Sequence, residues 1–185
     1  MAETPSNMLP LNTKAPAFKL PDTRTGEQLS LQELRSDQAT VIMFICNHCP
    51  YVKLILDKIV EVSEVYQSKG VSFIAINSND AEKYPADAPN KMHDTATNYH
   101  FTFPYLYDET QAVAKAYQAA CTPDFYIFDS QLACAYRGRF DDATPGNGQE
   151  VTGKDLCTAL DQILSGDSVE IEQKPSVGCN IKWKK

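Results

Sequence analysis

The sequence has no apolar stretch long enough for a membrane helix, which needs roughly 18 consecutive apolar residues. Residues 1–16 are polar and rich in proline, and they lack both the charged start and the apolar run of a secretory signal. We therefore expect a cytoplasmic protein that has no membrane partner.

Basic residues are in the minority, since 17 lysines and arginines stand against 24 acidic residues and give a net charge of -7. A nucleic-acid-binding face needs clustered positive charge, so we expect no nucleic acid among the partners. With 43% hydrophobic and 22% charged residues, the composition is that of a globular chain. We expect one domain over residues 1–185, and the sequence does not indicate its oligomeric state.

Hydrophobic periodicity predicts a strand, a helix and a second strand near the start of the domain. Residues 40–46 and 71–77 are nearly continuous apolar runs, which is typical of buried strands. Between them, apolar side chains recur at spacings of three and four from Val52 to Tyr66, which predicts an amphipathic helix. This succession predicts a right-handed crossover between two parallel strands.

The same reasoning predicts six later elements. In chain order they are a helix at 87–99, a strand at 103–107, a helix at 109–120, strands at 124–128 and 133–139, and a last helix after residue 152. The first of these helices lies in a polar insertion at about 78–102, and the chain from about residue 167 is expected to be an irregular tail. The order predicts an α/β fold with a mixed central sheet and helices on both faces.

Cys46 and Cys49 stand where the first predicted strand gives way to the first predicted helix. The N-terminus of a helix stabilises an anion, and the thiolate is the reactive form of cysteine. We expect Cys46 to be the attacking thiol and the more exposed one, Cys49 to be the resolving thiol, and Asn47 to cap the helix. A protonated His48 would stabilise the Cys46 thiolate, and His48 could also shuttle a proton. The alternative is that His48 is a solvated side chain with neither role.

Two other interpretations of the cysteine pair are a zinc site and a pair of inert core cysteines. A structural zinc site needs four ligands, usually in two pairs, and the sequence has no second CxxC. In a cytosolic chain, closely spaced cysteines indicate redox or metal chemistry rather than a structural disulfide. We favour redox chemistry and expect neither a metal nor a cofactor.

Three motifs together resemble the thioredoxin superfamily over about residues 12–165. They are CNHC after a buried strand, CTPDF (121–125) before the predicted hairpin, and APAFKLPD (15–22) near the N-terminus. The last motif and the insertion at 78–102 resemble the redoxin subgroup, which includes peroxiredoxins and TlpA-like reductases. NHCPYVK, CTPDF and GCNIKWK also resemble a set of bacterial redoxin proteins with a CNHC motif.

The resemblance implies a thioredoxin-like fold and a thiol-disulfide oxidoreductase. Its Cys46–Cys49 dithiol would exchange with protein or small thiol substrates, and a thiol reductant would be a partner. The resemblance also implies that the Thr122–Pro123 bond is cis, that it faces the CxxC pair, and that the backbone there binds the substrate strand.

Four further cysteines lie outside the CxxC pair. Cys121, beside the predicted cis-proline loop, and Cys179, near the C-terminus, could be further redox thiols, although a structural or incidental thiol is the simpler interpretation of each. We expect Cys134 and Cys157 to be packing residues.

The sequence also departs from the patterns that it resembles. Peroxiredoxins carry a threonine three residues before the peroxidatic cysteine, where this chain has Met43. This weakens the alternative function of an antioxidant thiol peroxidase, in which Cys46 would be oxidised to sulfenic acid and Cys49 would resolve it. Thioredoxin has a buried aspartate six residues before the first cysteine, where this chain has Thr40, so Cys49 needs another proton acceptor. A copper-handling protein is less favoured, because copper chaperones of this fold use CxxxC and a distal histidine.

Overall fold

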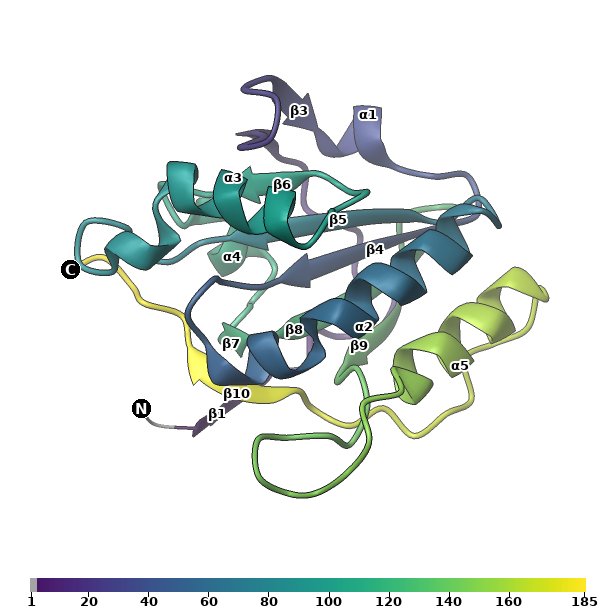
Figure 1. The fold of residues 1–185 in the computed structure, drawn as a ribbon. Coiled ribbons are helices and arrows are strands. Elements are labelled where there is room, and N and C mark those ends of the chain that lie inside the picture. The colour runs from purple at the N-terminus through teal and green to yellow at the C-terminus, as the bar shows by residue number, and fades with distance from the viewer. Residues whose placement is uncertain (1–2) are drawn as a thin grey trace.

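The computed structural model describes residues 3–185, and its central sheet has five strands in the order β6-β5-β4-β8-β9 (Figure 1). The strands are β4 (Ala39–Phe44), β5 (Ser72–Asn77), β6 (Tyr105–Tyr107), β8 (Asp124–Asp129) and β9 (Cys134–Gly138). β4 is parallel to β5 and β5 to β6, whereas β8 is antiparallel to both β4 and β9. The predicted mixed sheet, parallel crossover and hairpin are confirmed.

Helices cover both faces of this sheet, as predicted. They are α1 (Leu31–Leu34), α2 (Pro50–Gln67), α3 (Pro89–Asn98), α4 (Ala112–Ala116) and α5 (Lys154–Leu164). α2, α3 and α5 share one buried cluster with Val41 and Met43, whereas α1 and α4 share another with Ile42 and Phe44. Alternate residues of β4 thus face opposite layers, as strand geometry requires. No helix between residues 3 and 185 combines the length and the apolar character that a membrane crossing needs.

Several short elements differ from the predictions. β2 (Lys19–Pro21), β3 (Gln28–Ser30) and α1 were not predicted because they are only three or four residues long. The helix expected at 109–120 is confined to α4, because Gln111 directly before it and Gln118 shortly after it adopt positive φ angles of 63° and 54°. The insertion at 78–102 contains the 3-10 helix η1 (Pro85–Asp87) in addition to α3.

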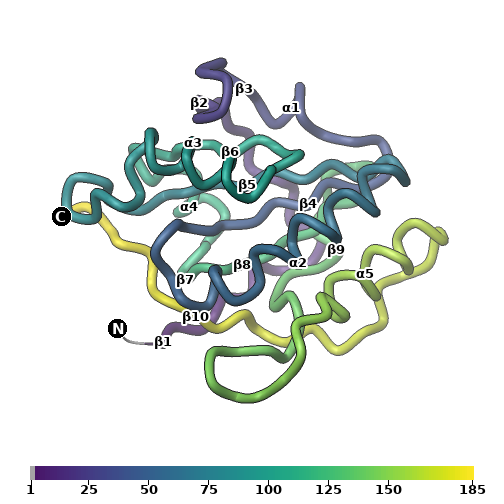
Figure 2. Tube along the Cα trace, in the orientation of Figure 1, coloured from purple at the N-terminus to yellow at the C-terminus, as the bar shows by residue number. Residues whose placement is uncertain are grey.

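The C-terminal segment contains a strand of a second, smaller sheet. β10 (Val177–Asn180) lies between β1 (Glu3–Pro5) and β7 (Cys121–Thr122) and is antiparallel to both. The prediction of an irregular tail from about residue 167 is therefore wrong for β10. Its partners are far away along the chain, so local periodicity carries no sign of the pairing. In Figure 2 the yellow C-terminal segment passes beside the first turn of α2.

A buried carboxyl group at the start of β8 makes stability depend on pH. Asp124 is fully buried, accepts a hydrogen bond from the Tyr126 hydroxyl at 2.9 Å, and burial raises its pKa to about 7. Asp124 therefore ionises at a lower pH in the unfolded chain than in the folded protein. As a result, the free energy of unfolding should fall as the pH rises from about 4 to about 7. A pKa difference of this size corresponds to about 4 kcal/mol.

Asp124→Asn should remove this pH dependence, because the amide does not ionise. Urea denaturation between pH 4 and pH 8 should show a smaller fall in stability for the variant than for the unsubstituted protein. The exposed control Asp167→Asn should follow the unsubstituted protein. Parallel curves for Asp124→Asn and the unsubstituted protein would show that Asp124 does not titrate in this range.

Candidate active site

The loop between β4 and α2 carries both cysteines of the CxxC pair. α2 begins at Pro50, where the missing N–H of proline does no harm. Proline disfavours the helical conformation for the residue that precedes it. Cys49, which precedes Pro50, is accordingly extended, with φ -69° and ψ 123°. Cys49 is therefore the N-cap, and the prediction that Asn47 caps the helix is wrong.

Both thiols face the loop that contains the cis peptide bond. The Thr122–Pro123 bond is cis, as the resemblance implied. The Cys46 Sγ lies 3.3 Å from the Thr122 Oγ1, and the Cys49 Sγ lies 3.2 Å from the Thr122 carbonyl oxygen. Cys46 is 2% exposed and Cys49 is 0% exposed, so Cys46 is the more exposed thiol only by a small margin and both thiols are buried.

The surroundings of the two thiols favour negative charge on Cys49. The hydrogen bond with Cys46 lowers the pKa of Cys49 against the effect of burial, and contacts with Cys179 and the backbone at Val52 lower it further. The hydrogen bond with Cys49, burial and the negative charge of Asp87 all raise the pKa of Cys46. The hydrogen bond with Cys46, more than the N-cap position, thus stabilises an anion at the second cysteine, and the attacking role of Cys46 stays a prediction.

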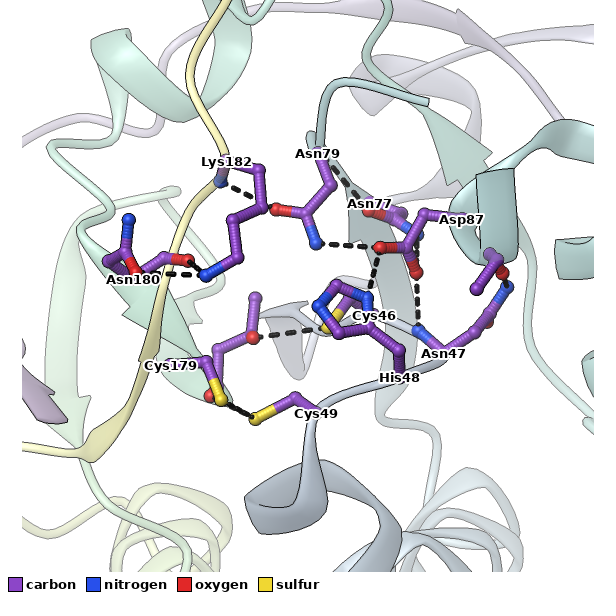
Figure 3. A network of polar contacts seen from close by, with 12 residues as sticks. Cys46, Asn47, His48, Cys49, Asn77, Asn79, Asp87, Cys179, Asn180 and Lys182 are labelled. Carbon is purple, nitrogen blue, oxygen red and sulfur yellow. Dashed lines mark hydrogen bonds and ion pairs between the residues drawn. The ribbon is translucent and has the colours of Figure 1, made fainter. Parts of the chain in front are cut away.

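Asp87, at the end of η1, is a buried site residue that the sequence did not reveal (Figure 3). Its Oδ1 accepts the Asn47 backbone N–H at 2.7 Å and its Oδ2 accepts the His48 Nδ1–H at 2.6 Å. The side chains of Asn77 and Asn79 donate to it at 3.2 and 2.8 Å. Burial raises the pKa of Asp87, but the hydrogen bonds from His48, Asn79 and Asn47 outweigh this effect, so its pKa lies below the ordinary value.

The ring of His48 is held between Asp87 and an aromatic side chain. It stacks on Tyr84, with ring centroids 5.6 Å apart and planes 7° from parallel. An ionised carboxylate can only accept a hydrogen bond, so Nδ1 carries the proton. Nε2 has no hydrogen-bond partner among residues 3–185. His48 is thus fixed in place rather than freely solvated, and Nε2 is available to accept a proton.

Cys46, His48 and Asp87 form the one mixed cluster of possible metal ligands found among residues 3–185. A ligand atom of each lies within 4.8 Å of the other two. Zinc takes such ligands, but a structural site needs four, and Asp87 already accepts hydrogen bonds from His48 and three other groups. A thiol, an imidazole and a carboxylate in this order suit proton transfer at the thiol better.

The other four cysteines differ in their relation to the pair. The Cys179 Sγ lies 2.8 Å from the Cys49 Sγ, so the structure brings this thiol into the site. The Cys121 Sγ instead contacts the carbonyl oxygen of Pro123 at 3.7 Å, and burial raises its pKa. Burial also raises the pKa of Cys134 and Cys157, and both are packing residues, as expected: Cys134 lies in one of the two buried clusters and the half-buried Cys157 packs against the other.

A CxxC pair at a strand–helix junction, opposite a cis-proline loop on a mixed five-stranded sheet, defines a redoxin with a thioredoxin-like fold. A sequence profile of the AhpC/TSA family matches residues 11–137, which is more than half of the chain. The chain therefore belongs to the AhpC/TSA family, and at the level of the family it is a redoxin-type oxidoreductase.

Solved structures share this fold. An uncharacterized conserved protein from Geobacillus kaustophilus is 56% identical over 100% of this chain and 97% of its own, with a TM-score of 0.98. A hypothetical protein from Sinorhizobium meliloti 1021 is 45% identical over 98% of both chains, with a TM-score of 0.95. A thiol:disulfide interchange protein of the thioredoxin family from Chlorobium tepidum TLS is 16% identical over 83% of this chain and 97% of its own, with a TM-score of 0.64, which shows the fold alone. A search of curated proteins gave no match.

Proposed function

We propose that the protein is a cytoplasmic thiol-disulfide oxidoreductase in which the Cys46–Cys49 pair exchanges with disulfides or thiols of protein or small-molecule substrates. A thiol reductant would return the pair to its dithiol form. The observation that carries this proposal is the position of both sulfurs against Thr122, at the N-terminus of α2, where Cys49 is stabilised as an anion.

The mechanism needs one attack on the substrate and one resolving step. The Cys46 thiol gives its proton to a base and attacks the substrate disulfide, so that a Cys46–substrate bond forms and the other substrate sulfur leaves as a thiolate. We assign the role of base to His48, which has a ring nitrogen within 4.8 Å of the Cys46 Sγ, and Asp87 balances the positive charge that His48 acquires. Cys49 then attacks the Cys46 sulfur, so that the Cys46–Cys49 bond forms, the Cys46–substrate bond breaks and the second substrate sulfur leaves as a thiolate. The contacts of Cys49 with Cys179 and with the backbone at Val52, which do not depend on the Cys46 thiol, lower the pKa of Cys49 and favour this step.

A thiol peroxidase is the second candidate function, and one contact favours it. The Thr122 hydroxyl lies 3.3 Å from the Cys46 Sγ and could donate a hydrogen bond to a peroxide there. The position that carries a threonine in peroxiredoxins is Met43, which is fully buried in β4 and offers no hydroxyl. We favour disulfide exchange because both thiols, rather than one alone, lie against Thr122.

Parallel assays with two oxidants test the proposal. With dithiothreitol as the reductant, the protein should accelerate the reduction of insulin disulfides well above the rate with dithiothreitol alone. Its consumption of hydrogen peroxide should not exceed that of an equal concentration of free thiol. Rapid peroxide consumption without acceleration of insulin reduction would replace the proposed function with the peroxidase.

A further inference from the structure

β10 pairs with the part of the chain that the family resemblance assigns to the substrate. In its register with β7, Cys179 stands opposite Thr122 and Asn180 stands opposite Cys121. The backbone of Thr122, which was expected to bind a substrate strand, is thus already paired with a strand of the same chain. Figure 1 shows β10 between β1 and β7, next to the start of α2.

Gly178 allows β10 to lie this close to the loop. A β-carbon at position 178 would overlap with the carbonyl oxygen of Thr122 and would lie 3.2 Å from the Cδ of Pro123. Any side chain at this position would push β10 away from the cis-proline loop. Glycine is therefore required for the approach that brings the neighbouring Cys179 into the site.

Cys49 lies between two thiols that belong to different segments of the chain. It interacts with Cys46 on one side, and its Sγ is 2.8 Å from that of Cys179 on the other (Figure 3). Cys179 is 3% exposed and lies on a paired strand, so this contact is part of the packed structure. Two sulfurs already in contact need little backbone movement to form a disulfide.

We propose that Cys179 is a third redox thiol, which accepts the disulfide from the Cys46–Cys49 pair and so acts as a built-in substrate of the active site. This inference rests on the proposed function of that pair. The Cys179 thiolate attacks the Cys49 sulfur of the oxidised pair, the Cys49–Cys179 bond forms and the Cys46–Cys49 bond breaks. Cys46 leaves as a thiolate and takes up the proton that Cys179 has lost. The exchange conserves the disulfide, so it needs no additional oxidant.

The oxidised pair is also the state in which Cys179 is best able to attack. In the reduced protein, burial and the hydrogen bond with Cys49 raise the pKa of Cys179 to about 12. Once Cys49 is part of a disulfide it carries no negative charge, so its contribution to the raised pKa disappears. The transfer leaves Cys46 as a free thiol in a protein that is still oxidised.

Oxidation of full-length Cys46→Ser with oxidised glutathione tests this inference. Cys49 should first form a mixed disulfide with glutathione, and Cys179 should then displace the glutathione. Mass spectrometry of the unreduced protein should show the loss of two free thiols, no bound glutathione, and a peptide that joins Cys49 to Cys179. Cys46→Ser/Cys179→Ser should stop at the glutathione adduct, whereas Cys46→Ser/Cys134→Ser should behave like Cys46→Ser.

Two further measurements use proteins that retain all three thiols. Partly oxidised protein without substitutions should contain both Cys46–Cys49 and Cys49–Cys179 disulfides. Gly178→Ala should lose the second disulfide and retain the first, with an unchanged circular dichroism spectrum. A persistent glutathione adduct on Cys49 of Cys46→Ser, or only the Cys46–Cys49 disulfide in the unsubstituted protein, would overturn the role of Cys179.

The two proposals fail in distinguishable ways. If insulin is not reduced but Cys49–Cys179 still forms in Cys46→Ser, the proposed function fails while the reactivity of Cys179 stands. If insulin is reduced and Cys49–Cys179 never forms, the role of Cys179 is overturned and the proposed function stands.

Discussion

Cys46→Ser and Cys49→Ser should each lower the rate of insulin reduction by roughly three orders of magnitude or more, because residues that act as one catalytic unit fail together. The two variants should nevertheless stop at different steps. Cys49→Ser retains the predicted attacking thiol but cannot resolve the Cys46–substrate bond, so mixed disulfides should accumulate. Cys46→Ser/Cys179→Ser lacks that thiol, and it also lacks the thiol that could displace a substrate from Cys49, so it should accumulate few adducts with a protein substrate.

Non-reducing electrophoresis after incubation with a disulfide-containing protein distinguishes these two outcomes. Adducts of Cys49→Ser should be abundant and should disappear on addition of dithiothreitol, and the buried-thiol control Cys134→Ser should retain the rate of the unsubstituted protein. The opposite pattern, with adducts mainly on Cys46→Ser/Cys179→Ser, would identify Cys49 as the attacking thiol. The lowered pKa of Cys49 would also suit an attacking thiol, so this experiment tests the prediction from the sequence that Cys46 attacks and Cys49 resolves.

Asp87→Ala should lower the free energy of unfolding by about 3–5 kcal/mol, the range observed when one partner of a buried charged network is removed. The Asn47 N–H, His48 and the side chains of Asn77 and Asn79 would all lose their acceptor. Because the pKa of Asp87 is lowered in the folded state, its contribution is present above the unfolded pKa of about 3.9 and is lost as the pH falls through the folded value. Urea denaturation at neutral and acidic pH measures both effects.

Asp87→Asn separates the charge of this side chain from its shape. The negative charge of Asp87 is one of the causes that raise the pKa of Cys46, so the amide should lower that pKa. The pH dependence of alkylation, measured in a Cys49→Ser background, should move to lower pH with Asp87→Asn. Asp94→Asn, an exposed carboxylate of the same insertion, is the matched control. An unchanged alkylation profile would show that Asp87 only supports the fold.

The order of the central elements could be predicted because their signals are local. A continuous apolar run identifies β4, and a spacing of three and four identifies α2, within a few residues of their observed bounds. The start of α2 was misplaced because the cap was assigned from the propensity of Asn47, whereas the following Pro50 decides where the helix can begin.

The missed parts of the site depend on contacts between distant segments. Asp87 stands in a polar stretch without periodicity, and only the tertiary fold brings it to His48. β10 was missed because its four residues acquire strand character from β1 and β7. The sequence could mark Cys179 as a possible redox thiol, but it could not show that its sulfur lies against Cys49.

The pairing of β10 with Thr122 makes the C-terminal strand a tethered competitor of any incoming peptide. A segment held on the same chain acts at an effective concentration on the order of millimolar, so a free peptide of equal intrinsic affinity must exceed that concentration to take its place. Small disulfides such as oxidised glutathione need only reach a sulfur atom and do not compete for backbone pairing. The equilibrium between β10 paired with β7 and β10 released from it would then determine whether protein substrates, as well as small disulfides, can react.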